Sequence, residues 1–298
     1  MIKFLNRSKG VIEIEKVYGD KWLNFTYQKI VGRFLLWVLI KRKLFSWWYG
    51  NSANSVKSKK KILPFIKKYN IDETEFLEPV TSFSNFNQFF YRRLKPNARP
   101  ISTSKQSVVF PADGRHLGFQ NISHVDAIYV KGQKFNIVDL FNSKEIAEPF
   151  LEGSLVISRL CPVDYHRFHF PYDGIISSPN LINGSLKSVN PIALKKEIKI
   201  FWENKRYLAL LKNQSLGSIA QFAVGATCVG SVTFTSKPET AVKKGEEFGY
   251  FSFGGSCIIT LFEKDKIKLS DDLIECSAKG LELYAKMGDE MGTFQNFN

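Results

Sequence analysis

The chain has 298 residues, 44% of them hydrophobic, so it is long enough to bury a full core as one large domain or two small ones. Its four cysteines form no CxxC pair and no metal-site spacing, and no cleavable secretory signal precedes them, so we expect reduced thiols in a cytoplasmic setting. The net charge of +14 is concentrated in residues 1–70, which hold sixteen Lys or Arg against three acidic residues. This asymmetry favours a negatively charged partner surface.

The basic segment contains an aromatic stretch, residues 22–49, in which cations interrupt the apolar run too often for a membrane span of about 20 residues. Lys29, Arg33 and Lys41 fall near one helical face, which suits a helix lying at a lipid interface. The alternative is a helix that packs on the core while its cations are solvated. Nucleic acid ranks last as a partner, because no base-reading or phosphate-cradling motif accompanies the charge.

Helical patterns follow this stretch. Residues 51–61 are polar without an apolar period and predict a linker or exposed loop, whereas residues 62–70 predict a short helix. Residues 81–95 begin with residues that favour an N-cap and carry apolar side chains at helical spacing. They predict a helix that ends at Pro96.

Short apolar runs separated by Gly, Pro and Asn begin near residue 107 and are typical of strands. They predict an α+β fold with a mainly-β core, a sandwich or barrel-like arrangement, preceded by amino-terminal membrane-interface helices. Short helices such as 137–141 are expected between strands. The predicted strand runs are 107–110, 127–130, 154–160, 207–211, 218–224, 227–235 and 257–262.

Three separated positions supply the groups of a nucleophilic triad. Ser256 follows two glycines and precedes an apolar run, where the open backbone suits either a nucleophile or an ordinary turn. Asp113 lies in a PADG sequence at a strand end, where Asp-Gly is a common turn. His166 and His169 lie between Pro162 and Pro171, and no third metal ligand stands out near them, which disfavours a zinc site. Asp113, His169 and Ser256 act together only if the fold brings them together.

Longer motifs occur in a fixed order between Gly19 and Gly292. They are FNxFFxRxLKPxxRP at 86–100, PADG at 111–114, RLxPxDYHRFHxP at 159–171, SVNP at 188–191, VGATxVGS at 224–231, KGEEFGYFSFGGS at 244–256 and MGDE at 287–290. These motifs and their order resemble those of the phosphatidylserine decarboxylases. Cys257 departs from the family, which usually has Thr or Ser there. A thiol is a weaker hydrogen-bond donor than a hydroxyl, but we expect cleavage to survive.

The resemblance implies a proenzyme that cuts its own chain between Gly255 and Ser256. In the family the serine hydroxyl attacks the preceding carbonyl and converts the amide into an ester. Carried over to this sequence, Ser256 is the nucleophile, His169 is the general base and Asp113 orients the imidazole and stabilises its charge.

The same resemblance implies a cofactor made from the chain itself. Elimination at Ser256 and loss of ammonia leave a covalent pyruvoyl group, which forms a Schiff base with phosphatidylserine and releases CO2 to give phosphatidylethanolamine. Neither a metal nor pyridoxal phosphate is needed. His166 is the candidate for handling the substrate carboxylate or returning the proton to carbon, and its alternative is support of the turn that holds His169.

The expected organisation is a membrane-associating segment, residues 1–70, followed by a decarboxylase domain, residues 71–298. Cleavage divides the precursor into a large chain, residues 1–255, and a small chain, residues 256–298. The expected partners are an anionic phospholipid surface and phosphatidylserine, with no nucleic acid, and a homo-oligomer is left open. The expected location is peripheral, on the cytoplasmic side of the cell membrane.

Three alternatives remain at this point. A pyruvoyl decarboxylase of a different amino-acid-headed lipid would differ only in its substrate. A Ser-His-Asp hydrolase would stay uncleaved and turn over esters, and a silent lipid-binding protein would stay uncleaved and release no CO2. Arg159, Arg167 and the Lys195-Lys196 pair are candidates for phosphate contact, although solvated charge is the commoner role of such residues.

Overall fold

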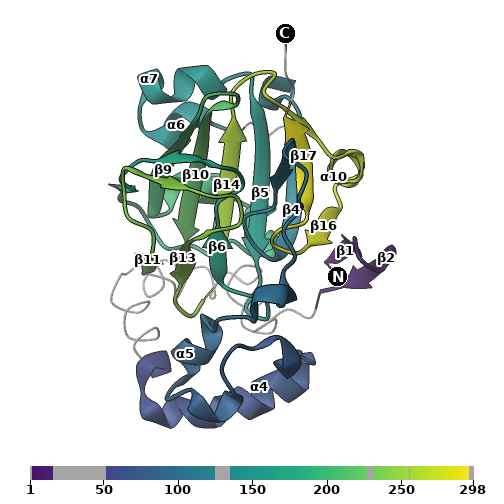
Figure 1. The fold of residues 1–298 in the computed structure, drawn as a ribbon, viewed down its shortest axis with the longest axis vertical. Coiled ribbons are helices and arrows are strands. Elements are labelled where there is room, and N and C mark those ends of the chain that lie inside the picture. Colours follow the sequence, from purple (N-terminus) through teal and green to yellow (C-terminus); the bar gives the residue numbers. More distant parts are fainter. Residues whose placement is uncertain (1, 16–51, 125–134, 227–230, 255, 295–298) are drawn as a thin grey trace.

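A computed structural model describes residues 2–15, 52–124, 135–226, 231–254 and 256–294 (Figure 1). The interface helix expected within 22–49 and the strand expected over 127–130 lie outside these residues. Within the described ranges, none of the helices combines the length and the hydropathy that crossing a membrane requires.

One eleven-stranded sheet dominates the molecule and confirms an α+β fold that is mostly β. Neighbouring strands are antiparallel except β1 and β16, which are parallel. The order is β12 (Thr240–Val242), β7 (Gly174–Ile176), β9 (Arg206–Asn213), β10 (Gly217–Gly225), β14 (Ser256–Phe262), β5 (Ser154–Leu160), β4 (Gly114–Phe119), β16 (Glu282–Ala285), β1 (Lys3–Asn6) and β2 (Val11–Ile14), with β8 (Asn180–Ile182) beside β9. Part of the basic segment thus belongs to this sheet, since β1 and β2 form its edge.

Two three-stranded sheets complete the β structure. They are β11 (Val232–Phe234), β13 (Glu247–Phe251) and β6 (Arg167–His169), and β15 (Ile267–Leu269), β17 (Glu290–Phe294) and β3 (Ser107–Val109). The sheet of β6, β11 and β13 lies over one face of the main sheet (Figure 1), where Phe168 and Phe251 share an apolar cluster with Ile258 and Phe262 of β14.

Short helices cover the opposite face. Successive side chains of a strand point to opposite faces, so Ile259 and Leu261 of β14 join a second apolar cluster, together with Phe141 and Phe201 from these helices. The helices are α6 (Ile137–Phe141), α7 (Lys144–Ala147), α8 (Pro191–Leu194) and α9 (Ile200–Glu203), while α10 (Asp271–Ala278) packs Leu273 into the first cluster. The prediction of a helix over 137–141 is confirmed.

A separate helical part, at the bottom of Figure 1, is built on a cluster of phenylalanines. It holds η2 (Val56–Lys61), α4 (Ile62–Tyr69) and α5 (Phe86–Phe90). The chain has further 3-10 helices, which are η3 (Glu73–Glu75), η4 (Val80–Ser82), η5 (Pro96–Ala98), η6 (Ile122–His124) and η7 (Glu148–Phe150). The predicted helix over 62–70 is confirmed. The predicted loop over 51–61 is wrong for 56–61, because Ser58 is buried there and its hydroxyl donates to the Ala53 carbonyl at 2.8 Å.

The predicted helix over 81–95 is much shorter than expected. The Asn85 side chain accepts from the Gln88 amide at 3.0 Å, so it caps a helix that begins only at Phe86. After Phe90 the chain turns out of the helix, and Leu94 forms an isolated β-bridge with Phe76. The apolar spacing that predicted one long helix instead supplies aromatic side chains to the phenylalanine cluster from several short elements.

Candidate active site

Ser256 is the first residue of β14, and both neighbouring strands hold it in register. Its partners are Gly225 of β10 and Leu160 of β5, and its side chain is fully buried. Its Oγ has no hydrogen-bond partner within the described part of the chain, an uncommon state for a buried hydroxyl. Gly254 has a φ of +143°, which L side chains rarely adopt, so glycine is required where the chain turns into β14. Gly255 lies outside the described residues.

His169 ends β6, and two contacts determine which ring nitrogen carries the proton. Nδ1 lies 2.9 Å from the Gly245 carbonyl oxygen, which can only accept, so Nδ1 donates. Nε2 lies 3.2 Å from the Tyr165 hydroxyl and accepts from it. Burial lowers the pKa of His169, although the Gly245 carbonyl raises it in part. The side chain is therefore a neutral imidazole with its lone pair at Nε2, as a general base requires.

Asp113 lies just before β4, and its carboxylate is held from two sides. Arg99 binds it in bidentate geometry, with Nε 2.8 Å from Oδ1 and Nη2 2.6 Å from Oδ2. The Met287 amide donates to Oδ1 at 2.9 Å. Arg99 also pairs with Glu75 at 2.9 Å, so a single guanidinium ties Asp113 to the segment before α5.

A backbone hydrogen bond and an electrostatic effect connect the Asp113 turn with His169. The His169 amide donates to the carbonyl of Pro111 at 2.7 Å, which fixes β6 beside the turn that carries Asp113. The Asp113 charge raises the pKa of His169, against the larger lowering by burial. Among the described residues, however, no hydrogen bond joins Asp113 to His169 or His169 to Ser256. The triad of Asp113, His169 and Ser256 therefore stays a prediction, because the described residues show no continuous hydrogen-bond chain through it.

Sequence reasoning missed three groups of this site, namely Arg99, Tyr165 and the carbonyl of Gly245. Each lies inside a motif that was recognised: Arg99 in the RP pair at 99–100, Tyr165 directly before His166, and Gly245 in the KGEE run. The motifs could therefore have pointed to these three groups. Only the fold shows which side chain or carbonyl each histidine contacts.

His166 is completely buried beside the turn that leads into β14. The Phe90 ring lies 3.8 Å from it between centroids, and its Nδ1 lies 3.0 Å from the Asp164 carbonyl oxygen, to which it donates. Nε2 has no partner within the described part of the chain. Burial, together with the smaller effect of the Arg92 charge, lowers the pKa of His166 to about 3, although the backbone groups of Asp164 and Gly254 act to raise it. A neutral ring nitrogen with a free lone pair therefore lies close to the predicted cleavage position.

A buried cluster of charged side chains supports the turn before β6. It consists of Glu15, Arg115, Arg159, Asp164 and Glu282. Arg115 reaches the Asp164 carboxylate at 2.5 Å, and the same carboxylate accepts from the Cys161 amide at 2.6 Å. These two bonds close the turn that presents Tyr165 and His166.

Replacement of Glu15 by Gln is expected to destabilise the fold at neutral pH. Burial opposes ionisation of Glu15, but the charge and hydrogen bonds of Arg159 overcome it and lower the pKa from 4.5 to about 2. Because the folded-state pKa is depressed, this stabilisation is present above the unfolded-state pKa and is lost as the pH falls toward the folded-state pKa. It amounts to roughly 3 kcal/mol.

Urea denaturation of wild type and of Glu15→Gln checks this prediction. The difference in stability should be largest near pH 7 and should shrink as the pH falls from about 5 to about 3. Glu13→Gln is the matched control, since Glu13 pairs with Lys9 at the surface, where such pairs contribute little. A Glu15→Gln deficit that does not depend on pH would contradict the assignment.

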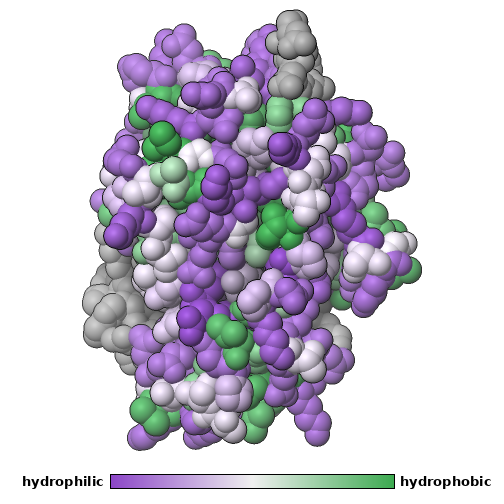
Figure 2. Space-filling model, in the orientation of Figure 1, coloured by the Kyte–Doolittle hydropathy of each residue, from purple (hydrophilic) through white to green (hydrophobic). Residues whose placement is uncertain are grey.

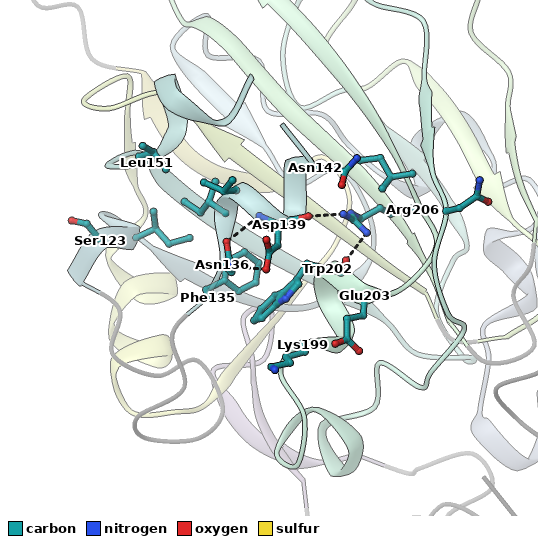
Figure 3. Close-up of a pocket in the computed structure, with 15 residues that line it drawn as sticks. Ser123, Phe135, Asn136, Asp139, Asn142, Leu151, Lys199, Trp202, Glu203 and Arg206 are labelled. Atoms are coloured by element: carbon teal, nitrogen blue, oxygen red, sulfur yellow. Dashed lines mark hydrogen bonds between the residues drawn. The ribbon is translucent and has the colours of Figure 1, made fainter. Parts of the chain in front are cut away.

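A pocket of about 900 Å³ lies on the helix-covered face of the main sheet (Figure 3). Three of its polar side chains are engaged with each other or with the backbone: Asn136 donates to Asp139 at 2.7 Å, and Arg206 donates to the carbonyls of Asp139 and Trp202 at 2.6 Å each. Ser256 and the two buried histidines do not line it. This pocket is therefore separate from the candidate active site.

Comparison with known proteins connects the geometry to a family. A family model described as phosphatidylserine decarboxylase matches residues 86–294. A curated phosphatidylserine decarboxylase proenzyme of Fusobacterium nucleatum subsp. nucleatum is 44% identical over 295 residues, covering 99% of this chain and 98% of the relative. Proteins of the same name from Clostridium novyi and Clostridium perfringens are 45% and 43% identical, each covering 98% of this chain and 99% of the relative.

Proposed function

Because the chain belongs to the phosphatidylserine decarboxylase family, we propose that it is a proenzyme that cuts itself between Gly255 and Ser256 and becomes a pyruvoyl-dependent carboxy-lyase acting on phosphatidylserine. The observation that carries this proposal is the state of Ser256, whose buried hydroxyl is unpaired among the described residues and follows a glycine of positive φ. An unpaired hydroxyl in a water-excluded position is free to attack the carbonyl that precedes it.

In the cleavage step His169 removes the Ser256 proton at Nε2 while Nδ1 stays bonded to the Gly245 carbonyl. The amide bond breaks as the ester bond forms, and the proton passes to the leaving amine. The fixed charge of Asp113 favours the imidazolium that forms on the way, which agrees with its raising effect on the pKa of His169. His169 must first release the Tyr165 hydroxyl, which occupies the same lone pair.

In the lyase step the pyruvoyl group derived from Ser256 supplies the sink for the electron pair of the breaking carbon–carbon bond. His166 contacts the substrate carboxylate and delivers the proton that replaces it on carbon. An ionised substrate carboxylate near Nε2 favours protonation of a ring whose pKa burial otherwise lowers to about 3. When CO2 leaves, the ring loses its anionic partner and becomes acidic enough to return the proton to carbon.

Vesicles of phosphatidylserine test the proposed function directly. The purified protein is expected to release CO2 from these vesicles and to accumulate phosphatidylethanolamine. Turnover of simple esters by an uncut chain would instead indicate a hydrolase, and release of CO2 only from a lipid with another amino-acid headgroup would change the substrate. An uncut chain that binds vesicles without releasing CO2 would overturn the enzymatic proposal altogether.

We also propose a peripheral position on an anionic membrane, at its cytoplasmic side, and the helical part supports contact with the membrane. Val56 and Leu63 are 74% and 64% exposed on η2 and α4. Six lysines surround them in the sequence, at 57, 59, 60, 61, 67 and 68. Figure 2 shows apolar patches among hydrophilic side chains at this end of the molecule. Apolar side chains among lysines match the chemistry of an anionic lipid interface. The segment 22–49, which precedes this surface in the sequence, is proposed to bind there too.

Replacement of Leu63 by Glu is expected to weaken binding to anionic vesicles about tenfold or more, because it removes an inserted apolar side chain and adds a repelled charge. Vesicle co-sedimentation measures the effect. Ile146→Glu is the matched control, since Ile146 is 39% exposed on α7, at the opposite end of the molecule (Figure 1). Equal binding by the Leu63 variant and wild type would remove α4 from the membrane surface.

A further inference from the structure

We propose that Arg92 binds the phosphodiester of the substrate headgroup, in a small pocket that the packing of Phe90 connects to His166. This inference rests on the proposed function and names a contact that the sequence motifs did not assign. The pocket has a volume of about 230 Å³, and its charged lining residues are Arg92, Arg93, Arg167 and Glu78. Guanidinium groups suit an anion, but only one that is not already paired with a carboxylate can bind a further one.

Among the described residues, Arg92 is the one of these three arginines that forms no ion pair, although the charges of Asp113 and Asp164 act on it from a distance. Arg93 binds Glu78 at 2.5 Å, and Arg167 binds Glu247 at 2.8 Å. Arg92 is only 5% exposed, yet it makes no ion pair within the described part of the chain, and its Nε has no partner there. The single hydrogen bond of its side chain among those residues is a long one, 3.4 Å from Nη1 to the Phe89 carbonyl.

Aromatic rings hold the Arg92 guanidinium in place without accepting hydrogen bonds from its N–H groups. The guanidinium carbon lies 4.8 Å from the Phe76 ring centroid and 5.0 Å from that of Phe89. Ring faces attract a cation but offer no acceptor for its N–H groups. Burial lowers the pKa of Arg92 to about 10, which leaves the group charged at neutral pH. A buried cation with unused donors, at the edge of a pocket, is matched by an anionic ligand.

Contacts through α5 connect this pocket to the reacting position. Phe90, two residues before Arg92, stacks on His166 and meets the edge of the Phe253 ring at 5.0 Å between centroids. The Asn87 side chain accepts from the Phe253 amide at 2.7 Å. The helix is thus fastened to the turn that leads to Ser256, and the Arg92 charge is felt by His166.

The headgroup has two anionic groups, and the chemistry of the reaction indicates which of them Arg92 binds. Phosphatidylserine carries a carboxylate that leaves as CO2 and a phosphodiester that the reaction does not change. A cation on the carboxylate would stabilise the substrate more than the transition state and so oppose its loss, whereas a cation on the phosphodiester anchors both equally. Two earlier candidates for phosphate contact are already paired, Arg159 with Glu15 and Glu282, and Arg167 with Glu247.

Binding to a Ser256→Ala precursor tests the inference without depending on cleavage or turnover. Isothermal titration with sn-glycero-3-phosphoserine, with serine and with inorganic phosphate is compared in this background and after adding Arg92→Gln. We expect glycerophosphoserine to bind more tightly than serine, and Arg92→Gln to reduce this advantage about tenfold or more. Lys237→Gln is the control, because it removes the same charge from an exposed turn before β12.

Several outcomes would overturn the inference. An unchanged advantage of glycerophosphoserine in Arg92→Gln would assign Arg92 to packing, and equal losses for serine and glycerophosphoserine would assign it to the carboxylate. Inorganic phosphate that binds as tightly as glycerophosphoserine would indicate a general phosphate site. If Arg92→Gln does not fold, Arg92→Lys keeps the charge but not the fork, and a retained full advantage in that variant would also count against bidentate binding. Failure of the proposed function would appear separately, as no CO2 release by wild type.

Discussion

A Ser256→Ala precursor is expected to remain a single chain and to release no CO2 from phosphatidylserine. The substitution removes the hydroxyl that attacks the Gly255 carbonyl, and with it the source of the pyruvoyl group, so the loss of activity should be complete. Denaturing mass spectrometry is the measurement. Wild type should give a large chain of residues 1–255 and a small chain that begins at position 256 with a pyruvoyl group in place of an amine.

Ser252→Ala is the matched control for this experiment. It makes the same chemical change four residues earlier, on a side chain that is only half-buried, and it should leave cleavage intact. An active wild-type preparation that contains only the uncut chain would disprove the self-cleavage proposal. Normal cleavage of Ser256→Ala would disprove the role of its hydroxyl.

Replacement of His166 by Ala is expected to leave self-cleavage largely intact but to lower decarboxylation by about 100-fold or more, the usual contribution of a general acid or base. The reason is that Nε2 of His166 is unpaired among the described residues and lies near Gly254, whereas both ring nitrogens of His169 are hydrogen-bonded, Nδ1 to the Gly245 carbonyl and Nε2 to the Tyr165 hydroxyl. Chain masses and CO2 release from one preparation separate the two effects.

A second variant separates chemistry from support of the turn. His166→Asn keeps an amide that can donate to the Asp164 carbonyl, as Nδ1 does, but it has no ring nitrogen in the position of Nε2. If His166 only supports the turn, Asn should restore decarboxylation. If Nε2 handles the substrate, both variants should be cleaved and both should fail to turn over.

The contacts of His169 assign different parts to the two groups beside it. In a Ser-His-Asp triad the carboxylate holds the Nδ1 proton, but here the Gly245 carbonyl lies at Nδ1 and Asp113 is bound by Arg99. The carbonyl fixes the tautomer, while Asp113 contributes a charge that favours the imidazolium. In the proposed cleavage, orientation and charge stabilisation of the imidazole, which the resemblance assigns to Asp113 alone, are therefore divided between Gly245 and Asp113.

The strands could be predicted where burial is simplest. β5 and β14 lie at the centre of the main sheet and are buried along their whole length, so most of their residues are apolar and the runs stand out in the sequence. The prediction of one helix over 81–95 was wrong because the burial of its phenylalanines depends on residues outside this region. Its phenylalanines are spaced as in a helix, but they meet a cluster formed with Phe65, Phe76 and Phe253, which are distant in sequence. Periodicity reports which side chains are buried, not which elements bury them.

The sequence by itself determined the chemical groups of this protein: the glycine pair before Ser256, the two histidines in one short motif, and the order of motifs that identifies the family. Only the tertiary structure decided their states. Gly245 rather than Asp113 holds the Nδ1 proton of His169, and Arg92 alone of three neighbouring arginines lacks a carboxylate among the described residues. Hydrogen-bond partners and burial depend on residues far apart in the chain, so local sequence patterns do not contain them.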